Sequence, residues 1–237
     1  MTVALRRART SLALTAALLA ALTACGGSED RKPEDAGPTG GDPASQALIE
    51  KVNEAMRTTT FHSSGTTTAF AEGDQETTWD PDKGLRTVAS GTYSGEMYCK
   101  DGVNYLSSGL LAASLGQSGQ QLDVPEALAD KFVYTDTGQQ CTAMFSIDPS
   151  GRLTPDKDTE VDGRPTKAVT VEGAGGSDVY QVSASGPPYI LQLVSDRGGR
   201  TSTTTFDAFG EPTDITMPPD SLLVPLEDFQ KQATPTE

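Results

Sequence analysis

Few residues in this chain offer reactive chemistry, and its three cysteines, Cys25, Cys99 and Cys141, come first among them. Cys25 follows a basic start with three arginines in residues 6–9 and an apolar stretch over residues 12–22. A charged segment, a short apolar segment and small residues before a cleavage point are the features of a secretory signal peptide. Residues 1–24 are therefore predicted to direct the chain out of the cytoplasm.

Cys25 comes directly after Leu22-Thr23-Ala24, an arrangement that resembles the lipobox of bacterial lipoproteins. The resemblance implies cleavage before Cys25 and a diacylglyceryl group on its sulfur, which would anchor the protein to the cell membrane at its extracytoplasmic face. Two acyl chains give stable anchoring, at ~0.8 kcal/mol per buried methylene. The alternatives are an ordinary signal peptide or an uncut membrane anchor, although a spanning helix needs ~20 apolar residues.

Cys99 and Cys141 would remain in the processed chain. Outside the cytoplasm, a pair of cysteines is most simply read as a disulfide. Closing this loop would restrict the unfolded chain by roughly 4 kcal/mol on the loop-entropy model. The alternatives are two buried free thiols or a redox pair, but the C-x-x-C spacing of a redox pair is absent.

Catalytic residue patterns are scarce. The single histidine, His62, lies beside Phe61 and has no cysteine or serine motif to pair with, so a structural or surface role is predicted. Neither a G-x-S-x-G elbow nor a phosphate-binding G-x-x-x-x-G-K-[ST] loop occurs. The acidic run Asp156-Lys157-Asp158 lacks the spacing of a calcium loop. We expect no enzyme activity, no cofactor and no metal site.

The charge balance disfavours nucleic acid as a partner. Removing residues 1–24, which hold three arginines and no acidic residue, would change the formal net charge from −15 to −18. Such a protein is repelled by nucleic acid and by anionic lipid, so Cys25 would have to anchor it alone. An acidic, solvated surface that keeps the protein soluble is the simplest interpretation.

The next segments position the domain. Residues 26–43 are rich in glycine, proline and charge and hold no large apolar side chain, so 25–43 is predicted to be a lipidated cysteine followed by a flexible tether. As a random coil, the 26–43 segment would have an end-to-end distance of roughly 25 Å. A helix is expected next, with Asp42 as its N-cap and Pro43 at its first position. Its apolar stripe is predicted to contain four residues: Leu48, Val52, Ala55 and Met56.

From Phe61 onward, short β-favouring runs alternate with turn residues, which predicts an antiparallel sheet. Asp101-Gly102 and Asp162-Gly163 each separate two such runs, a strong hairpin signal. Further strands are expected over 179–184, 189–194 and 200–206, with short helices over 110–115 and 125–132. Trp79 is interpreted as a core residue, with a ligand contact as the alternative.

The order of these motifs resembles the actinobacterial LppX/LprG-type lipoproteins, relatives of the LolA-like half-barrels. The resemblance rests on residues 101–105, on Val161-Asp162-Gly163 and above all on residues 206–218, and it covers roughly 45–225. It implies an α+β fold in which a curved antiparallel half-barrel wraps around an N-terminal helix and short inserted helices. We therefore expect a domain over 44–226 and a C-terminal tail over 227–237.

The resemblance also implies an apolar cavity for acyl chains. From the strand pattern, the candidate lining residues are Val169, Val171, Leu191 and Leu193. The leading hypothesis is a non-enzymatic, membrane-anchored protein that binds or carries a lipid or other apolar ligand. The alternative is a tethered module that docks an envelope protein or senses the envelope and has no ligand cavity.

Overall fold

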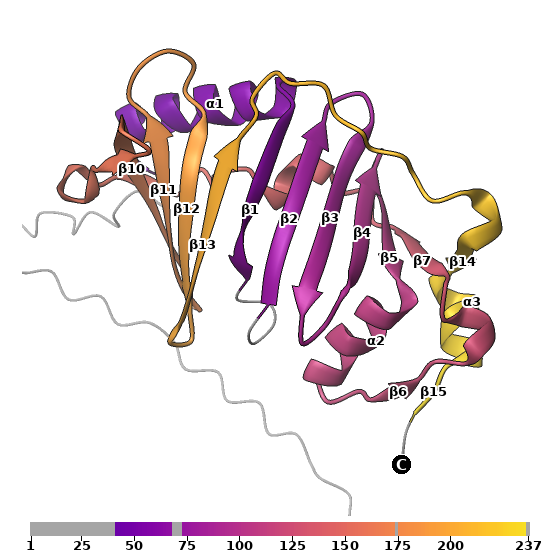
Figure 1. The fold of residues 1–237 in the computed structure, drawn as a ribbon. Helices are drawn as coiled ribbons and strands as arrows, with labels where there is room; N and C mark the ends of the chain where they lie inside the picture. Colours follow the sequence, from indigo (N-terminus) through magenta and orange to yellow (C-terminus); the bar gives the residue numbers. More distant parts are fainter. Residues whose placement is uncertain (1–40, 68–72, 174, 236–237) are drawn as a thin grey trace, which may run out of the picture. The chain divides into compact units, whose positions relative to one another are not determined.

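A wide, mostly antiparallel sheet organises residues 41–67, 73–173 and 175–235, the part of the chain that this computed structural model describes (Figure 1). All of these residues belong to one unit, Pro38–Glu237. The predicted signal peptide, Cys25 and the predicted tether up to residue 40 lie outside the described residues. The predicted α+β class is confirmed: the sheet is open and is accompanied by helices.

The elements follow one another with short connections. In chain order they are α1 (Pro43–Thr58), β1 (Phe61–Thr67), β2 (Gly73–Asp80), β3 (Gly84–Gly91), β4 (Gly95–Lys100), β5 (Val103–Ser107), α2 (Ser108–Gln117), β6 (Leu122–Asp123), η1 (Glu126–Leu128), β7 (Phe132–Asp136), η2 (Cys141–Met144), β8 (Arg152–Leu153), η3 (Pro155–Lys157), β9 (Glu160–Val161), β10 (Arg164–Gly173), β11 (Gly176–Ser183), β12 (Ile190–Arg197), β13 (Arg200–Asp207), η4 (Asp220–Leu222), β14 (Leu223–Pro225), α3 (Leu226–Gln232) and β15 (Thr234–Pro235).

The sheet order is β14-β7-β5-β4-β3-β2-β1-β13-β12-β11-β10-β8, with β9 also paired to β10. Most neighbours are sequential hairpin partners, and the main departure is the pairing of β1 with β13. Gly65 permits this pairing, since a Cβ there would lie 1.9 Å from the carbonyl oxygen of Thr203. The two halves of the sheet are thus joined along residues 62–65 of β1, and the closest approach is at Gly65.

The N-terminal helix α1 begins as predicted. The Asp42 carboxylate accepts hydrogen bonds from the backbone amides of Ala44 and Ser45 at 3.0 and 3.1 Å, and Pro43 occupies the first turn. The hydrogen bond from the Ser45 side chain, followed by the backbone bonds, lowers the pKa of Asp42. The β-branched run after residue 57 returns the chain to an extended backbone at Thr59.

The buried stripe of α1 differs from the predicted one. Its buried residues are Ser45, Ile49, Val52 and Met56, whereas Leu48 and Ala55 are only partly buried. Burial of each large apolar side chain contributes about 1.5–3 kcal/mol. The stripe is rotated toward Ile49 because the helix packs into the main core, where Met56 meets the start of β12.

Two predicted hairpins are present and one predicted helix is not. Asp101 and Asp162 adopt positive φ angles of 51° and 50° before glycines, and the flanking strands pair as expected. The predicted helix over 125–132 was wrong beyond one 3₁₀ turn, η1. Phe132 begins β7 instead, because its aromatic and β-branched run pairs with β5.

A second, smaller core lies beyond β7. The segment predicted as a C-terminal tail, 227–237, carries most of α3, and Phe229 is fully buried there with Leu128, Val133 and Ala233. The strand before α3, β14, pairs parallel to β7. Figure 1 shows α3 and α2 near the β5–β7 side of the sheet, while α1 crosses the ends of strands on the other side.

Candidate functional site

One cavity of about 390 Å³ lies on the inner face of the sheet. Its lining residues come from strands β1 to β4 and β11 to β13 and from η2: Phe61, Ser63, Gln75, Thr77, Leu85, Thr87, Met97, Met144, Phe145, Tyr180, Leu193, Thr204 and Phe206. Side chains from strands as far apart in the sheet as β4 and β11 reach the same space. The sheet must therefore curve around it, as the half-barrel prediction requires.

One end of the cavity is aromatic. Phe61 packs edge-on against Phe145 at a ring-centroid distance of 5.0 Å and lies 5.5 Å from Phe206. Trp79 lies 5.1 Å from Phe145 and is buried, so its interpretation as a core residue is confirmed. Its indole N–H donates to the Arg57 carbonyl oxygen at 3.3 Å, which ties this cluster to α1.

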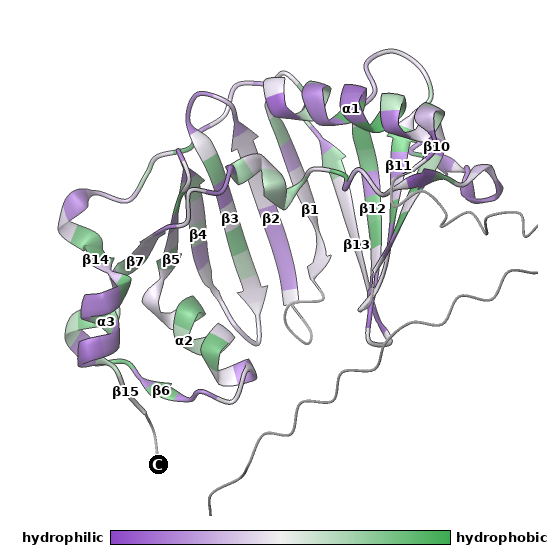
Figure 2. Ribbon diagram, turned by 180° about the vertical axis from the view of Figure 1, so that it is seen from behind, coloured by the Kyte–Doolittle hydropathy of each residue, from purple (hydrophilic) through white to green (hydrophobic). Residues whose placement is uncertain are grey.

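Beyond this end, the lining residues of β1 and β2 are polar but uncharged, whereas Met97 and Leu193 at the two sides are apolar. Strand alternation puts Ser63, Thr77 and Thr87 on the same face as Phe61. The Thr77 and Thr87 hydroxyls bond each other at 2.9 Å. Farther along the strands, Gln75 and Thr204 face the same space on either side of Gly65. Figure 2 shows the contrast: β12 is largely hydrophobic, whereas β1 and β2 are mostly pale or hydrophilic.

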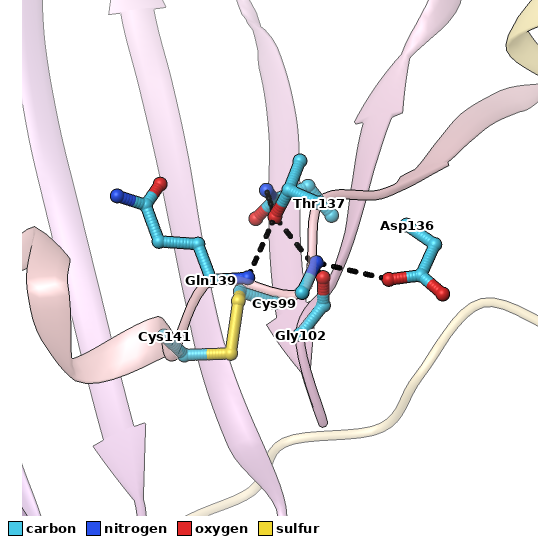
Figure 3. The surroundings of a disulfide bond; sticks show 8 residues. Cys99, Gly102, Asp136, Thr137, Gln139 and Cys141 are labelled. Carbon is cyan, nitrogen blue, oxygen red and sulfur yellow. Dashed lines mark hydrogen bonds between the residues drawn. A yellow bond between two sulfur atoms is a disulfide. The ribbon is translucent and has the colours of Figure 1, made fainter.

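The segment over the cavity is anchored by the predicted disulfide. Cys99 in β4 and Cys141 in η2 are joined, with their Cα atoms 5.6 Å apart (Figure 3). Just before the bond, Thr137 donates its backbone and hydroxyl hydrogens to the Gly102 carbonyl oxygen at 3.0 and 3.1 Å. The chain therefore enters η2 from a fixed point on the β4–β5 hairpin.

A second anchor lies after η2. The Asn53 side chain accepts from the Ile147 amide at 2.8 Å and donates to the Ile147 carbonyl oxygen at 2.9 Å. Ser45 accepts from the Leu153 amide at 2.8 Å. Between these anchors, Met144 and Phe145 face the cavity, and Met144 is the one exposed large apolar side chain among the described residues, at 45% exposure. Met144 therefore marks the mouth of the cavity.

Tyr180 is the one titratable residue in the lining. Desolvation by burial, with a further contribution from the charge of Asp178, raises the pKa of Tyr180 to about 12. The charged groups of the β3–β4 pair belong to the opposite face, where Arg86 donates to Glu96 at 2.8 Å and that bond lowers the pKa of Glu96. The cavity lining is thus electrically neutral at physiological pH.

The four candidate lining residues are only partly brought together. Leu193 lines the cavity, and Val169 and Val171 belong to the same core cluster without reaching the cavity surface. Leu191 is the unpaired residue at a register shift in the β11–β12 pair, and it contributes to a separate depression with Tyr189 and Phe209.

Sequence reasoning missed most of the lining. Phe61 and Phe206 start and end strands that were recognised, but nothing in the sequence shows that β1 pairs with β13. One sequence pattern could have indicated the polar lining. In β1 and β2, the inward positions between a glycine and an aromatic residue are all serine, threonine or glutamine.

Other sequence candidates lie outside the cavity. The His62 ring nitrogen lies 3.0 Å from the Asp207 carboxylate in an exposed pair. Asp156 and Lys157 belong to the exposed turn η3. Within the described ranges, no group of three or more histidine, cysteine or acidic residues could hold a metal ion. Those ranges also contain no helix with the length and apolar character needed to cross a membrane.

No protein-family model and no curated protein matches the chain. Several solved structures are similar to it. LprF from Mycobacterium bovis is 14% identical, covering 76% of this chain and 99% of its own, with a TM-score of 0.44. The lipoprotein LppX from Mycobacterium tuberculosis is 14% identical, covering 74% and 100%, with a TM-score of 0.44. An uncharacterized conserved protein from Thermus thermophilus is 11% identical, covering 77% and 99%, with a TM-score of 0.49. These similarities are too distant to assign a function, and family membership stays a prediction.

The raised pKa of Tyr180 predicts a specific loss of stability in alkali. In the unfolded chain its phenol ionises near pH 10, whereas in the folded protein it stays neutral to about pH 12. Its contribution to stability is therefore complete below about pH 10 and is lost as pH rises toward 12. Urea unfolding should show a smaller decline over this range for Tyr180→Phe than for the unmodified protein. The stability of a Tyr134→Phe control should decline more over this pH range than that of Tyr180→Phe. Equal declines in all three proteins would contradict the assignment to Tyr180.

Proposed function

We propose that this protein is a lipid-anchored extracytoplasmic binding protein that holds an apolar ligand in the cavity between β4 and β11 and catalyses no reaction. The observation that carries the proposal is the cavity itself, 390 Å³ of space with aromatic and aliphatic walls and a few polar groups. Sites for small molecules have this composition and volumes of about 300–1,000 Å³.

The cover over the cavity supports a binding role. Phe145 and Met144 close one side of the cavity from a segment fixed by the Cys99–Cys141 disulfide and by Asn53. A fixed cover keeps the cavity open at little entropic cost, because the loop has few conformations to lose when a ligand enters. The exposed Met144 provides a flexible apolar edge where a ligand could enter.

The proposed location rests on the sequence and on the disulfide. Disulfides persist in oxidising compartments outside the cytoplasm. The leader-like residues 1–24 and the lipobox-like run ending at Cys25 support export and lipid attachment. A tether over 26–40 would hold the domain near the membrane, which is the source of apolar ligands.

Filling the cavity should abolish ligand retention. Thr204 faces the cavity and is 7% exposed, so Thr204→Phe places a ring in the ligand space. We expect mass spectrometry of protein purified natively from its host to find an apolar molecule on the unmodified protein and much less on Thr204→Phe. Thr205→Phe is the matched control, because neighbouring strand residues face opposite sides.

Circular dichroism and thermal unfolding of both variants would confirm that each is folded. Equal ligand content in Thr204→Phe and Thr205→Phe would contradict a ligand in this cavity. An unmodified protein that carries no apolar molecule but retains a stoichiometric protein partner would favour the tethered interaction module instead.

The anchor is tested separately with Cys25→Ala. The variant should leave the membrane fraction, and the unmodified protein should carry the added mass of a diacylglyceryl group, since two acyl chains give stable membrane binding. Ser28→Ala, three residues farther along, should stay membrane-bound. A Cys25→Ala protein that partitions with membranes as before would refute lipid attachment at this residue.

A further inference from the structure

The inner face of the sheet changes from apolar to polar along the strands. In the first row, Phe61, Trp79 and Leu85 lie side by side across β1, β2 and β3. Four residues along β1, a row reaches from Gln75 through Gly65 to Thr204. At a rise of about 3.3 Å per residue, the two rows are roughly 13 Å apart. The cavity therefore has one apolar end and one largely polar end, in which Leu193 lies between Thr204 and Tyr180.

Hydrogen-bonding groups without protein partners lie at the polar end and in the row before it, where Ser63 pairs with Phe206. Three of the residues that carry them, Ser63, Thr204 and Tyr180, are 4%, 7% and 8% exposed. Within the described residues, none of these three hydroxyls forms a hydrogen bond, and neither does the Gln75 amide. Their polar atoms open onto the cavity and are not enclosed by protein, since the one fully buried side-chain polar atom without a partner among the described residues is Asn104 Oδ1. These groups are positioned to bond a molecule in the cavity.

The groups at the polar end are all neutral. Serine, threonine, glutamine and tyrosine can each donate and accept, but none supplies a full charge to balance an anion. The row beyond Tyr180 carries Asp178, which pairs with Arg197 and accepts a hydrogen bond from Ser195 at 2.6 Å. That arginine is already neutralised. A carboxylate or phosphate in the cavity would be buried without a counterion, which is costly.

The volume restricts the ligand further. At 390 Å³, the cavity is close to the lower end of the range of about 300–1,000 Å³ for small-molecule sites. The roughly 13 Å between its rows suits one extended alkyl chain of medium length. Two or three long chains side by side would need the cover between Cys141 and Ile147 to move, and both of its ends are held.

We propose that the cavity takes a neutral amphiphile with a single alkyl chain, resting on the apolar-ligand function proposed above. Its chain lies against Phe61, Phe145 and Phe206, and its hydroxyl or carbonyl head bonds Tyr180, Gln75 and Thr204. A monoacylglycerol or a long-chain alcohol has this chemistry. An ionised fatty acid and a phospholipid do not.

The test uses the full-length lipidated protein in phosphatidylcholine vesicles and three photoreactive probes. Each probe carries a diazirine at the end of a lauroyl chain: monolauroylglycerol, lauric acid and dilauroylglycerol. At about pH 9 the fatty acid is ionised. Cross-linked peptides are mapped by mass spectrometry, and labelling is normalised to the amount of each probe in the vesicles.

We expect monolauroylglycerol to label peptides containing Leu85 or Phe145 at least about tenfold more than either other probe, the ratio produced by roughly 1.4 kcal/mol. Tyr180→Phe should reduce this labelling by about three- to tenfold, the effect of one lost hydrogen bond. Tyr134→Phe, which removes a phenol outside the cavity, should leave it unchanged.

The outcomes separate the two proposals. If no probe labels the cavity, both the apolar-ligand function and the neutral single-chain ligand are refuted. If lauric acid or dilauroylglycerol labels it as strongly as the monoester, the function stands and the neutral single-chain assignment is overturned. If the monoester labels unmodified protein and Tyr180→Phe equally, the head group is not at Tyr180 and the proposed orientation is wrong.

Discussion

The constraint behind this structure is that a curved sheet must fill its own inner face. Side chains from β4 to β11 converge on one space, and within the described part of the chain α1 and the segment after Cys141 pack into the same core. These two elements fill the end where Phe61, Trp79 and Phe145 meet. Beyond that end, the inner face of β1 and β2 carries small polar side chains that cannot fill the remaining volume.

The cover depends on two kinds of bond that act on opposite sides of the cavity. The disulfide holds η2 to β4, and Asn53 satisfies both backbone groups of Ile147 from α1. On the loop-entropy model, a bond across 42 residues contributes roughly 4 kcal/mol, largely by restricting the unfolded chain. The same bond that stabilises the domain therefore also fixes the position of η2 beside β4.

Local signals predicted much of this fold. Asp42-Pro43 marks a helix start through capping, and Asp101-Gly102 and Asp162-Gly163 mark turns through the positive φ that they permit. These features depend on neighbouring residues alone. The stripe of α1 was misjudged because Leu48 and Ile49 are both apolar, and only the packing partner decides which is buried.

Long-range pairing could not be read in the same way. Phe132, predicted as the last residue of a helix, instead begins β7, which pairs with β5 and with the distant β14. The pairing of β1 with β13 brings Ser63 and Phe206 together from opposite ends of the domain. The cavity is a product of that closure, which is why Leu193 was found from the sequence and Tyr180 was not.

The most direct measurement is a crystal structure of the protein purified natively from its host. The account predicts continuous electron density between Phe61 and Tyr180, with one elongated arm at the aromatic end and a polar terminus near Gln75. A cavity closed by inward movement of Met144 and Phe145, with the Ser63 and Thr204 hydroxyls bonded to protein groups, would contradict it.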